Sequence, residues 1–421
     1  MNLWIKNGHI VDPATGRDEV GDLYVVNGKI AKGLTGEYET IDATGKYVMP
    51  GFVDLHVHLR EPGFEYKETI RTGTMAAARG GFTGVCPMPN TKPATDSPER
   101  IQKILEIAKK DSPIHVYPVG AITIGQAGET LTDIEGMVKA GAKAISEDGK
   151  SVMNAALYEK AMKEAARLGI PVMAHCEDKN LVGKGAMNAG KVAERLGIPG
   201  ITNAVEDVIV ARDILLAKET GAKLHLCHCS TADSAKMIEE ARKDGVNVSG
   251  EVCPHHFTLT EEDIVEDDAN YKMNPPLRKK SDVEMLKEGL RKGIFEAIST
   301  DHAPHGEEEK KKSIADAPFG IVGSETAFAL AVTELVKKGI LTMSELVQKM
   351  SVNPCHILGV EGGSLAEGKP ADITIADIDK EYLIEKDAFV SKGKSTPFDG
   401  KKVVGKVEYT IVEGNVVYPF K

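Results

Sequence analysis

The stretch DLHVHLREPG, residues 54–63, is informative about both the fold and the chemistry of the chain. It begins as an apolar run in which His56 and His58 stand two residues apart, and it ends in a proline–glycine turn. Because side chains alternate along a strand, both histidines point to one face while Leu55 and Val57 point to the other. The pattern predicts a buried strand whose carboxyl end carries two imidazoles.

Short apolar segments of the same kind recur along the chain, and most are separated by helical stretches such as PERIQKILEIAKKD, residues 98–111. The eight segments are residues 52–58, 81–89, 115–123, 142–148, 171–177, 223–230, 246–254 and 295–304. Strand-like segments that alternate with helices in this way predict an α/β fold, the (β/α)8 TIM-type barrel. We assign residues 51–358 to this barrel as the catalytic domain.

Both ends of the chain differ from this pattern. Residues 1–50 alternate β-branched runs with turns, and Asn-Gly pairs at 7–8 and 27–28 are hairpin signals. The C-terminal part returns to the same style in VVGKVEYTIVEGNVVYPF, residues 403–420. We therefore predict one small β-sandwich domain built from both termini, residues 1–50 and 359–421.

Composition disfavours several classes of function. A net charge of −11 argues against a nucleic-acid or anionic-membrane surface, since both need basic patches. The apolar runs are shorter than the ~18 residues of a membrane span, and MNLWIKNGHIVD at the start lacks the pattern of a signal peptide. Six cysteines without a C-x-x-C pair predict reduced thiols and a cytoplasmic location.

Polar side chains stand at the predicted carboxyl ends of the barrel strands, where barrels place their functional groups. They are His56, His58, Asn90, Asp148, His175, His228 and Asp301. A single buried histidine is more often structural, but imidazoles and carboxylates from several strands together predict a divalent metal such as zinc. His9 and His115 are predicted to be surface or structural residues, and strand parity predicts that His225 packs outward. His255 and His256 stay unassigned, with a structural role slightly favoured.

Six motifs carry a resemblance to a known family. They are HVHLREPG (56–63), MPNT (88–91), SEDG (146–149), AHCED (174–178), MNPPLR (273–278) and STDHAPH (299–305). In this order they resemble dihydroorotase of the amidohydrolase superfamily, in its longer form related to the dihydroorotase domain of multifunctional pyrimidine enzymes. The resemblance covers nearly the whole chain. It implies reversible, zinc-dependent cyclisation of N-carbamoyl-L-aspartate to L-dihydroorotate in pyrimidine (UMP) biosynthesis.

The resemblance also implies a ligand set. His56 and His58 would hold a first metal, and His175 and His228 a second. Asp301 would be a ligand and the general acid/base, while water activated by the metal attacks the ring amide. Asp148 stands where many superfamily members carry a carboxylated lysine. Because aspartate is shorter, the resemblance leaves one Zn2+ or two per subunit open.

Substrate contacts follow from the same resemblance. Arg60, two residues beyond His58, has a planar fork that suits a carboxylate. The family places this arginine around the substrate carboxylate together with Asn90 and His305. Asn274 and the backbone at Phe319 and Gly320 would contact the ring edge. Asp54 is predicted to orient a ligand histidine.

Two further expectations concern regulation. The charged segment 302–320 is predicted to be a mobile flap, since its run from Glu307 to Lys312 cannot anchor itself by burial. Cys176, next to His175, is predicted as an inhibitory zinc ligand. The resemblance implies a complex with aspartate transcarbamoylase, and we expect a homo-oligomer.

Two alternatives stay open on sequence alone. A hydantoinase, dihydropyrimidinase or allantoinase shares the fold, but hydantoinases typically keep the bridging lysine and lack an arginine after H-x-H. A non-catalytic scaffold homologue has usually lost ligands, whereas every expected ligand is present here.

Overall fold

The computed structural model describes residues 2–420, and it contains all eight barrel strands expected from the sequence. The barrel strands are β6 (Phe52–Val57), β7 (Phe82–Pro87), β8 (His115–Val116) with β9 (Val119–Ala121), β10 (Ala144–Ser146), β11 (Pro171–Ala174), β14 (Lys223–Leu226), β15 (Val248–Val252) and β16 (Ala297–Ile298). The third strand is split into β8 and β9 at Pro118, which has no N–H to donate to a neighbouring strand. The predicted fold class is confirmed.

The strands form two parallel sheets that close into a ring. One sheet runs β6-β7-β8 and the other runs β9-β10-β11-β14-β15-β16. Closure between β6 and β16 occurs at the end of β6 and just past the end of β16, where Val57 pairs with His302 and the His58 N–H donates to the His302 carbonyl at 2.8 Å. The barrel therefore closes at the end that carries the predicted site.

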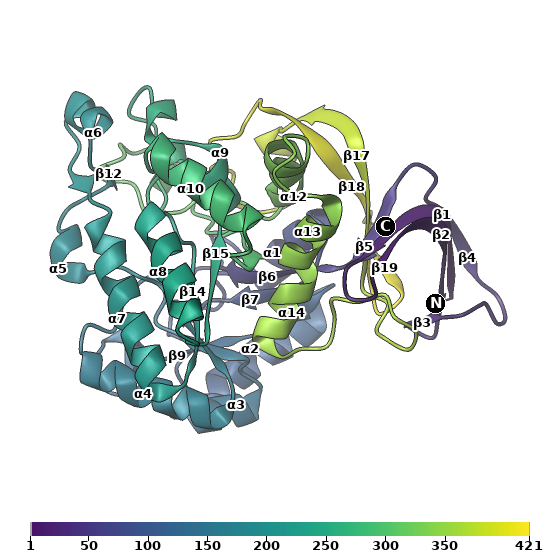
Figure 1. The fold of residues 1–421 in the computed structure, drawn as a ribbon, viewed down its shortest axis with the longest axis horizontal. Helices are drawn as coiled ribbons and strands as arrows, with labels where there is room; N and C mark the ends of the chain where they lie inside the picture. Colours follow the sequence, from purple (N-terminus) through teal and green to yellow (C-terminus); the bar gives the residue numbers. More distant parts are fainter. Residues whose placement is uncertain (1, 421) are drawn as a thin grey trace.

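Helices cover the outside of the barrel (Figure 1). They are α1 (Ile70–Arg79), α2 (Pro98–Asp111), α3 (Ile134–Ala140), α4 (Ala155–Leu168), α7 (Ala204–Thr220), α8 (Ala232–Lys243), α10 (Lys280–Arg291), α12 (Ala327–Ala331), α13 (Met343–Val347) and α14 (Asn353–Leu358). Helix α4 shows why they form: its first turn is capped by the Asn154 side chain and it ends at Gly169 in a left-handed conformation. Its buried face is Tyr158, Ala161, Met162 and Ala165, which is the spacing of one helical stripe.

Short elements occupy the loops at the carboxyl end of the barrel strands. They are α5 (Lys179–Val182), β12 (Met187–Asn188), α6 (Lys191–Leu196), β13 (Gly200–Ile201), α9 (Pro254–Thr258) and α11 (Glu307–Lys310). Within residues 2–420, every helix is too short or too polar to span a bilayer.

Both chain ends meet in a second sheet, to the right of the barrel in Figure 1. Its strands are β1 (Leu3–Asp12), β2 (Arg17–Val26), β3 (Lys29–Ala31), β4 (Glu39–Asp42), β5 (Tyr47–Pro50), β17 (Ile373–Leu383), β18 (Lys402–Val412) and β19 (Asn415–Tyr418). Their order is β19-β18-β17-β5-β1-β2-β3, and β4 pairs with β1. The antiparallel pairing of Val48 with Ile375 joins the two halves, and both side chains are completely buried.

Candidate metal centre

Six predicted ligand side chains converge at the carboxyl ends of five barrel strands. They are His56 and His58 at β6, Asp148 after β10, His175 after β11, His228 after β14 and Asp301 after β16. All six are more than nine-tenths buried. Parallel strands that end on the same side of a barrel bring residues far apart in the sequence into one cluster.

Asp148 lies at the middle of the cluster. Its Oδ1 lies 3.1 Å from His56 Nε2, 3.3 Å from His175 Nδ1 and 3.6 Å from His228 Nε2. Its Oδ2 lies 3.5 Å from His58 Nε2. This short carboxylate therefore reaches all four predicted ligand histidines.

Asp301 and a pair of histidines complete the cluster. Asp301 Oδ1 lies 3.2 Å from His58 Nε2 and 3.7 Å from His56 Nε2. His175 Nδ1 and His228 Nε2 are 3.0 Å apart. A tetrahedral zinc ion with bonds of about 2.1 Å keeps its ligand atoms roughly 3.4 Å apart. The spacing within the cluster thus suits a metal ion of this size.

Unpaired polar atoms support the same conclusion. Ten buried side-chain nitrogen and oxygen atoms of the described residues have no hydrogen-bond partner, and five of them belong to this cluster. These five are His56 Nδ1, His56 Nε2, Asp148 Oδ1, His175 Nε2 and His228 Nδ1. Buried polar groups are normally hydrogen-bonded, so this concentration of atoms without a hydrogen bond is what the ligands of a cation would show. The residues present fit a divalent metal with nitrogen and oxygen ligands.

The charges of the cluster favour a cation. Burial raises the pKa of Asp148, but His56, His175 and His228 outweigh burial and hold this pKa well below its usual range. Burial lowers the pKa of His175, whereas Asp148 and Glu177 raise it to about 10. The carboxylate is therefore ionised, and the cluster attracts positive charge as protons or as a metal ion.

Three site residues have left-handed backbone conformations. The φ angles are 61° at Arg60, 34° at His228 and 49° at Asp301. Residues other than glycine seldom adopt positive φ, and each instance costs about 1–3 kcal/mol. All three lie just beyond a strand, where the turn directs the side chain into the mouth of the barrel.

His225 does not pack outward, so this prediction is wrong. Its Nε2 lies 3.0 Å from Glu251 Oε2, while Glu251 Oε1 lies 3.3 Å from His56 Nδ1. All three side chains are completely buried. The parity argument failed because β14 ends at Leu226, and His228 follows at a positive φ where strand alternation no longer applies.

Glu251 on β15 is the main site residue that the sequence analysis missed. Its Oε1 also accepts from the backbone N–H of His228 at 3.2 Å, and Cys227 lies in the same group around His56. Burial raises the pKa of Glu251, but His225 and His56 outweigh burial and hold it far below its usual range. The available signal was a lone carboxylate within the otherwise uncharged strand VSGEV.

Two polar residues hold the histidines of β6. Asn90 Oδ1 lies 2.9 Å from His58 Nδ1 and accepts a hydrogen bond from it, which leaves Nε2 free for the cluster. Asp54 accepts from the hydroxyl of Thr300 and from the backbone N–H groups of Thr300 and His56. Asp54 therefore ties β6 to the turn before Asp301, and it contacts the backbone of a ligand histidine instead of its ring.

A cavity of about 200 Å³ opens above the cluster. It is lined by His58, Arg60, Asn90, Asp148, Gly149, His175, His228, Asn274, Asp301, Ala303, His305, Phe319 and Gly320. Every residue that the sequence analysis proposed for substrate binding lies at this cavity, and their individual roles stay predictions.

Arg60 and His305 form a cationic wall of the cavity. Arg60 Nε donates to the Pro304 carbonyl at 3.0 Å. His305 Nε2 lies 2.8 Å from the Phe319 carbonyl, which can only accept, and Lys67 Nζ donates to His305 Nδ1 at 3.1 Å. These partners fix the neutral tautomer with its proton on Nε2. Because Nε2 carries a proton, it cannot accept a hydrogen bond from Arg60 Nη2, which lies 3.2 Å away. The Nη protons of Arg60 are therefore available to an anion.

Burial and the positive charges nearby keep His305 neutral. Burial first, and then Arg60 and Lys67, lower the pKa of His305 to about 2. Across the cavity, the Asn274 side-chain amide donates to Glu177. The wall thus presents the positive charge of Arg60 beside a neutral imidazole. The charge of Lys67, behind His305, is paired with Glu309 at 3.0 Å between Nζ and Oε1.

The segment 302–320 is anchored, so the prediction that it lacks burial is wrong. Helix α11 turns Lys310 inward, where only 9% of it is exposed. Its Nζ donates to three backbone carbonyls, those of Lys272, Pro318 and Gly320, at 3.2, 3.2 and 2.8 Å. Ile314 is also buried. The mobility of the segment stays a prediction.

Cys176 turns away from the metal centre, which contradicts its predicted role as an inhibitory ligand. Its Sγ lies 4.0 Å from Asp213 Oδ2, in the packing between β11 and α7. Strand alternation continues past the end of β11, so His175 faces the mouth and Cys176 faces the helices. Burial first, and then Asp213, raise the pKa of this thiol well above its usual range.

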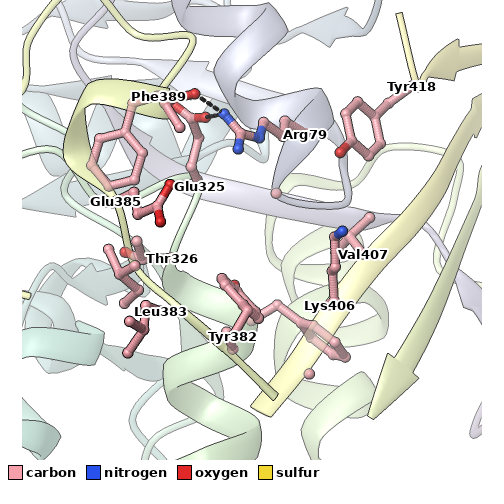
Figure 2. Close-up of a pocket in the computed structure, with 16 residues that line it drawn as sticks. Arg79, Glu325, Thr326, Tyr382, Leu383, Glu385, Phe389, Lys406, Val407 and Tyr418 are labelled. Atoms are coloured by element: carbon pink, nitrogen blue, oxygen red, sulfur yellow. Dashed lines mark hydrogen bonds and ion pairs between the residues drawn. The ribbon is translucent and has the colours of Figure 1, made fainter. Parts of the chain in front are cut away.

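A larger cavity, of about 290 Å³, lies between the barrel and the terminal sheet (Figure 2). It is lined by residues of α1, α12, β17 and β18 and by the ion pair of Arg79 with Glu325, 2.9 Å between Nη1 and Oε2. None of the described residues that line it is a histidine, cysteine or aspartate. The chemistry of the lining therefore favours the smaller cavity as the active site.

Comparison with solved structures agrees with the fold. L-Hydantoinase (dihydropyrimidinase) from Arthrobacter aurescens has a TM-score of 0.87 at 27% sequence identity, covering 98% of this chain and 95% of that chain. A D-hydantoinase has a TM-score of 0.85 at 27% identity, covering 99% and 95%.

Comparison of sequences identifies the family. A family model described as dihydro-orotase-like matches residues 45–234. A dihydroorotase from Pelotomaculum thermopropionicum is 50% identical over 421 residues, covering 99% of this chain and 98% of the relative. A dihydroorotase from Bacillus cereus is 48% identical over 422 residues, again covering 99% and 98%. With this similarity over nearly the full length of both partners, the chain belongs to the dihydroorotase family.

Proposed function

We propose that the chain is a cyclic amide hydrolase that interconverts N-carbamoyl-L-aspartate and L-dihydroorotate in pyrimidine biosynthesis. One observation carries the proposal: a His/Asp cluster and the free Nη protons of Arg60 face the same cavity of about 200 Å³. Dihydroorotate is a cyclic amide with one carboxylate. Its ring amide would face the His/Asp cluster, and its carboxylate would face Arg60. Curated relatives named dihydroorotase, at 48–50% identity, support the same reaction.

We propose that the cofactor is zinc, one or two ions per chain. The ligands would be His56, His58, Asp148, His175, His228 and Asp301. Imidazole nitrogen and carboxylate oxygen are the ligands of catalytic zinc, which keeps a position open for water. When bound, zinc would lower the pKa of a water molecule and polarise the ring carbonyl.

Asp301 would be the proton shuttle. Burial raises its pKa, but His58, His56 and His228 outweigh burial and leave the pKa below its usual range, so the carboxylate is ionised. In hydrolysis Asp301 would take a proton from the attacking water and return it to the departing amide nitrogen. In cyclisation the same group would deprotonate the ureido nitrogen and protonate the leaving oxygen.

The cationic wall would bind the substrate carboxylate. Arg60 would supply its free Nη protons, with Asn90 and the neutral His305 beside it. Asn274 and the backbone at Phe319 and Gly320 would contact the ring edge. This arrangement supports dihydroorotase over hydantoinase, because hydantoin lacks a carboxylate for Arg60.

Rates on competing cyclic amides, measured together with metal content, test the proposal. We expect dihydroorotate to be hydrolysed with a kcat/KM roughly tenfold or more above those of hydantoin and allantoin, since a charge-assisted contact contributes about 1.5–3 kcal/mol. Zinc should be present at the catalytic cluster, at one or two ions per chain. Faster turnover of hydantoin or allantoin would assign the chain to another cyclic amide, and no turnover of any substrate would favour a scaffold.

We also propose a cytoplasmic homo-oligomer that associates with aspartate transcarbamoylase, which makes carbamoyl aspartate. The resemblance to the longer dihydroorotases supports this proposal. Sedimentation of the chain alone and mixed with that enzyme tests it, and a monomer that does not bind the enzyme contradicts it.

A further inference from the structure

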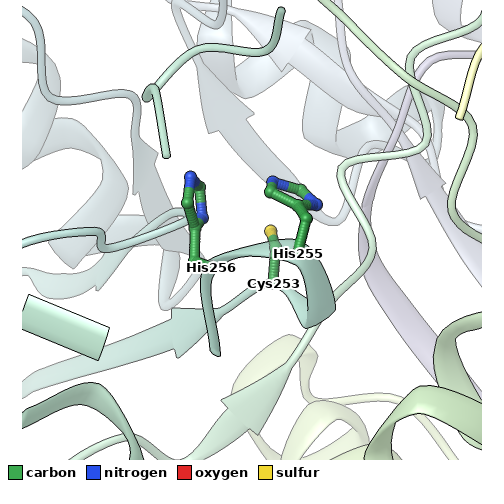
Figure 3. A group of neighbouring side chains, drawn as sticks. All are labelled: Cys253, His255 and His256. Carbon is green, nitrogen blue, oxygen red and sulfur yellow. The ribbon is translucent and has the colours of Figure 1, made fainter. Parts of the chain in front are cut away.

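A second group of potential ligands lies where β15 passes into α9. Cys253, His255 and His256 each offer one ligand atom, and these atoms all lie within 4.8 Å of one another. Figure 3 shows their side chains rising from the same side of the turn. All three are at least 98% buried, and none lines the cavity above the catalytic cluster.

The two histidines have unpaired nitrogens in this buried place. His256 Nε2 lies 2.9 Å from the Pro275 carbonyl, which can only accept, so Nε2 carries the proton. In the neutral imidazole, Nδ1 then holds a bare lone pair, and Nδ1 has no hydrogen-bond partner among the described residues. His255 Nε2 is unpaired as well. Fixing one ring nitrogen through a carbonyl is the usual way that proteins prepare the other nitrogen as a ligand.

A metal ion bound here would displace the thiol proton of Cys253, because cysteine binds a metal as its thiolate.

We propose that Cys253, His255 and His256 form a metal site of their own, which takes a borderline transition-metal ion such as Zn2+ through one thiolate and two imidazoles. This ligand set is one that zinc prefers, and three protein ligands leave a fourth position for water. The inference does not depend on the proposed reaction.

The site would act on the catalytic cavity through Pro275. His256 holds the Pro275 carbonyl, and the preceding residue, Asn274, lines the cavity. A metal ion that fixes His256 would therefore fix the position of Asn274. These three ligands would be positioning residues.

Cobalt substitution tests the site without measuring activity. A thiolate bound to Co2+ gives an intense near-ultraviolet charge-transfer band, whereas the imidazoles and carboxylates of the catalytic cluster give only weak visible bands. We expect the Co2+-loaded full chain to show the thiolate band and to bind one more metal ion per chain than Cys253→Ser. The band should persist in the matched controls Cys176→Ser and Cys227→Ser.

A second variant tests the site independently, in case Cys253→Ser misfolds. His255→Gln removes a ring whose Nε2 has no protein partner, so the fold should tolerate it. This variant should need roughly tenfold or more Co2+ to develop the same band, because loss of a ligand weakens metal binding at least as much as loss of an outer partner. A thiolate band that survives in Cys253→Ser, or its absence from the wild-type chain while the visible bands are present, would overturn the proposal.

Discussion

Replacing Arg60 by methionine should separate binding of the carboxylate from the rest of catalysis. Arg60 is 9% exposed, its Nε is committed to the Pro304 carbonyl, and its Nη protons face the cavity. A charge-assisted contact contributes about 1.5–3 kcal/mol, and 1.4 kcal/mol corresponds to a factor of ten. We therefore expect KM for dihydroorotate to rise roughly 10- to 150-fold in Arg60→Met.

The assay compares two substrates and two variants. Hydrolysis of dihydroorotate and of dihydrouracil, which lacks the carboxylate, is followed for the wild-type chain, Arg60→Met and Arg60→Lys. Turnover of dihydrouracil should change little in either variant. Arg60→Lys keeps the charge but loses the planar guanidinium that can bind a carboxylate through two N–H groups. Its KM for dihydroorotate should therefore lie between those of the wild-type chain and Arg60→Met.

A thermal unfolding curve of each variant controls for damage to the fold. Losing the bond to the Pro304 carbonyl removes one buried hydrogen bond, at a cost of about 1–3 kcal/mol in the free energy of unfolding. Equal losses of kcat/KM on dihydroorotate and dihydrouracil would refute the assignment and show that Arg60 only supports the structure around it.

Four further perturbations test the site. Asp301→Asn should lower kcat roughly 100-fold or more while metal analysis still finds the ion, and a rate above a tenth of wild type would rule out the proton shuttle. Lys67→Met removes the donor that fixes the tautomer of His305; KM should rise several-fold with kcat nearly unchanged, and a loss confined to kcat would contradict this. Lys310→Met leaves three carbonyls without their donor, so protease should cut within 305–320 faster than in wild type, and a bound substrate analogue should reduce the difference. Removal of metal by a chelator should abolish turnover and lower the melting temperature, and zinc should restore both; full activity of the metal-free chain would exclude a catalytic metal.

Much of the barrel and its site could be predicted from local patterns. Alternating strands and helices fix the number of barrel strands, and the rule that function lies at carboxyl ends then gathers His56, Asp148, His175 and Asp301 at one mouth. These predictions need only the direction of each strand, which the sequence provides. The residues proposed for substrate binding reach the same cavity for the same reason.

The predictions that failed depended on where single side chains point. The direction of the His225 side chain was inferred by counting alternate residues back from His228. That inference was wrong because His228 lies in a left-handed turn beyond the strand. The side chain of Cys176 was expected to point toward the metal because the residue lies beyond the strand. Instead the side-chain alternation of β11 continues through Cys176, which faces Asp213. Lys310 belongs to a charged run that looks solvated, and its burial is explained by three backbone carbonyls, that of Lys272 and those of Pro318 and Gly320 later in its own segment. Backbone turns and tertiary contacts decide such cases, and neither leaves a local pattern.

The pairing of β5 with β17 has a consequence for the order of folding during synthesis. β5 leaves the ribosome long before its antiparallel neighbour β17 has been made. At about 5–20 residues per second, the roughly 320 residues between the two strands take on the order of 15–65 s to synthesise. Throughout that interval one side of β5 presents unpaired backbone groups, which can recruit a strand from another nascent chain. The terminal sheet can therefore misassemble while the chain is being made, and slower translation should increase aggregation through this edge.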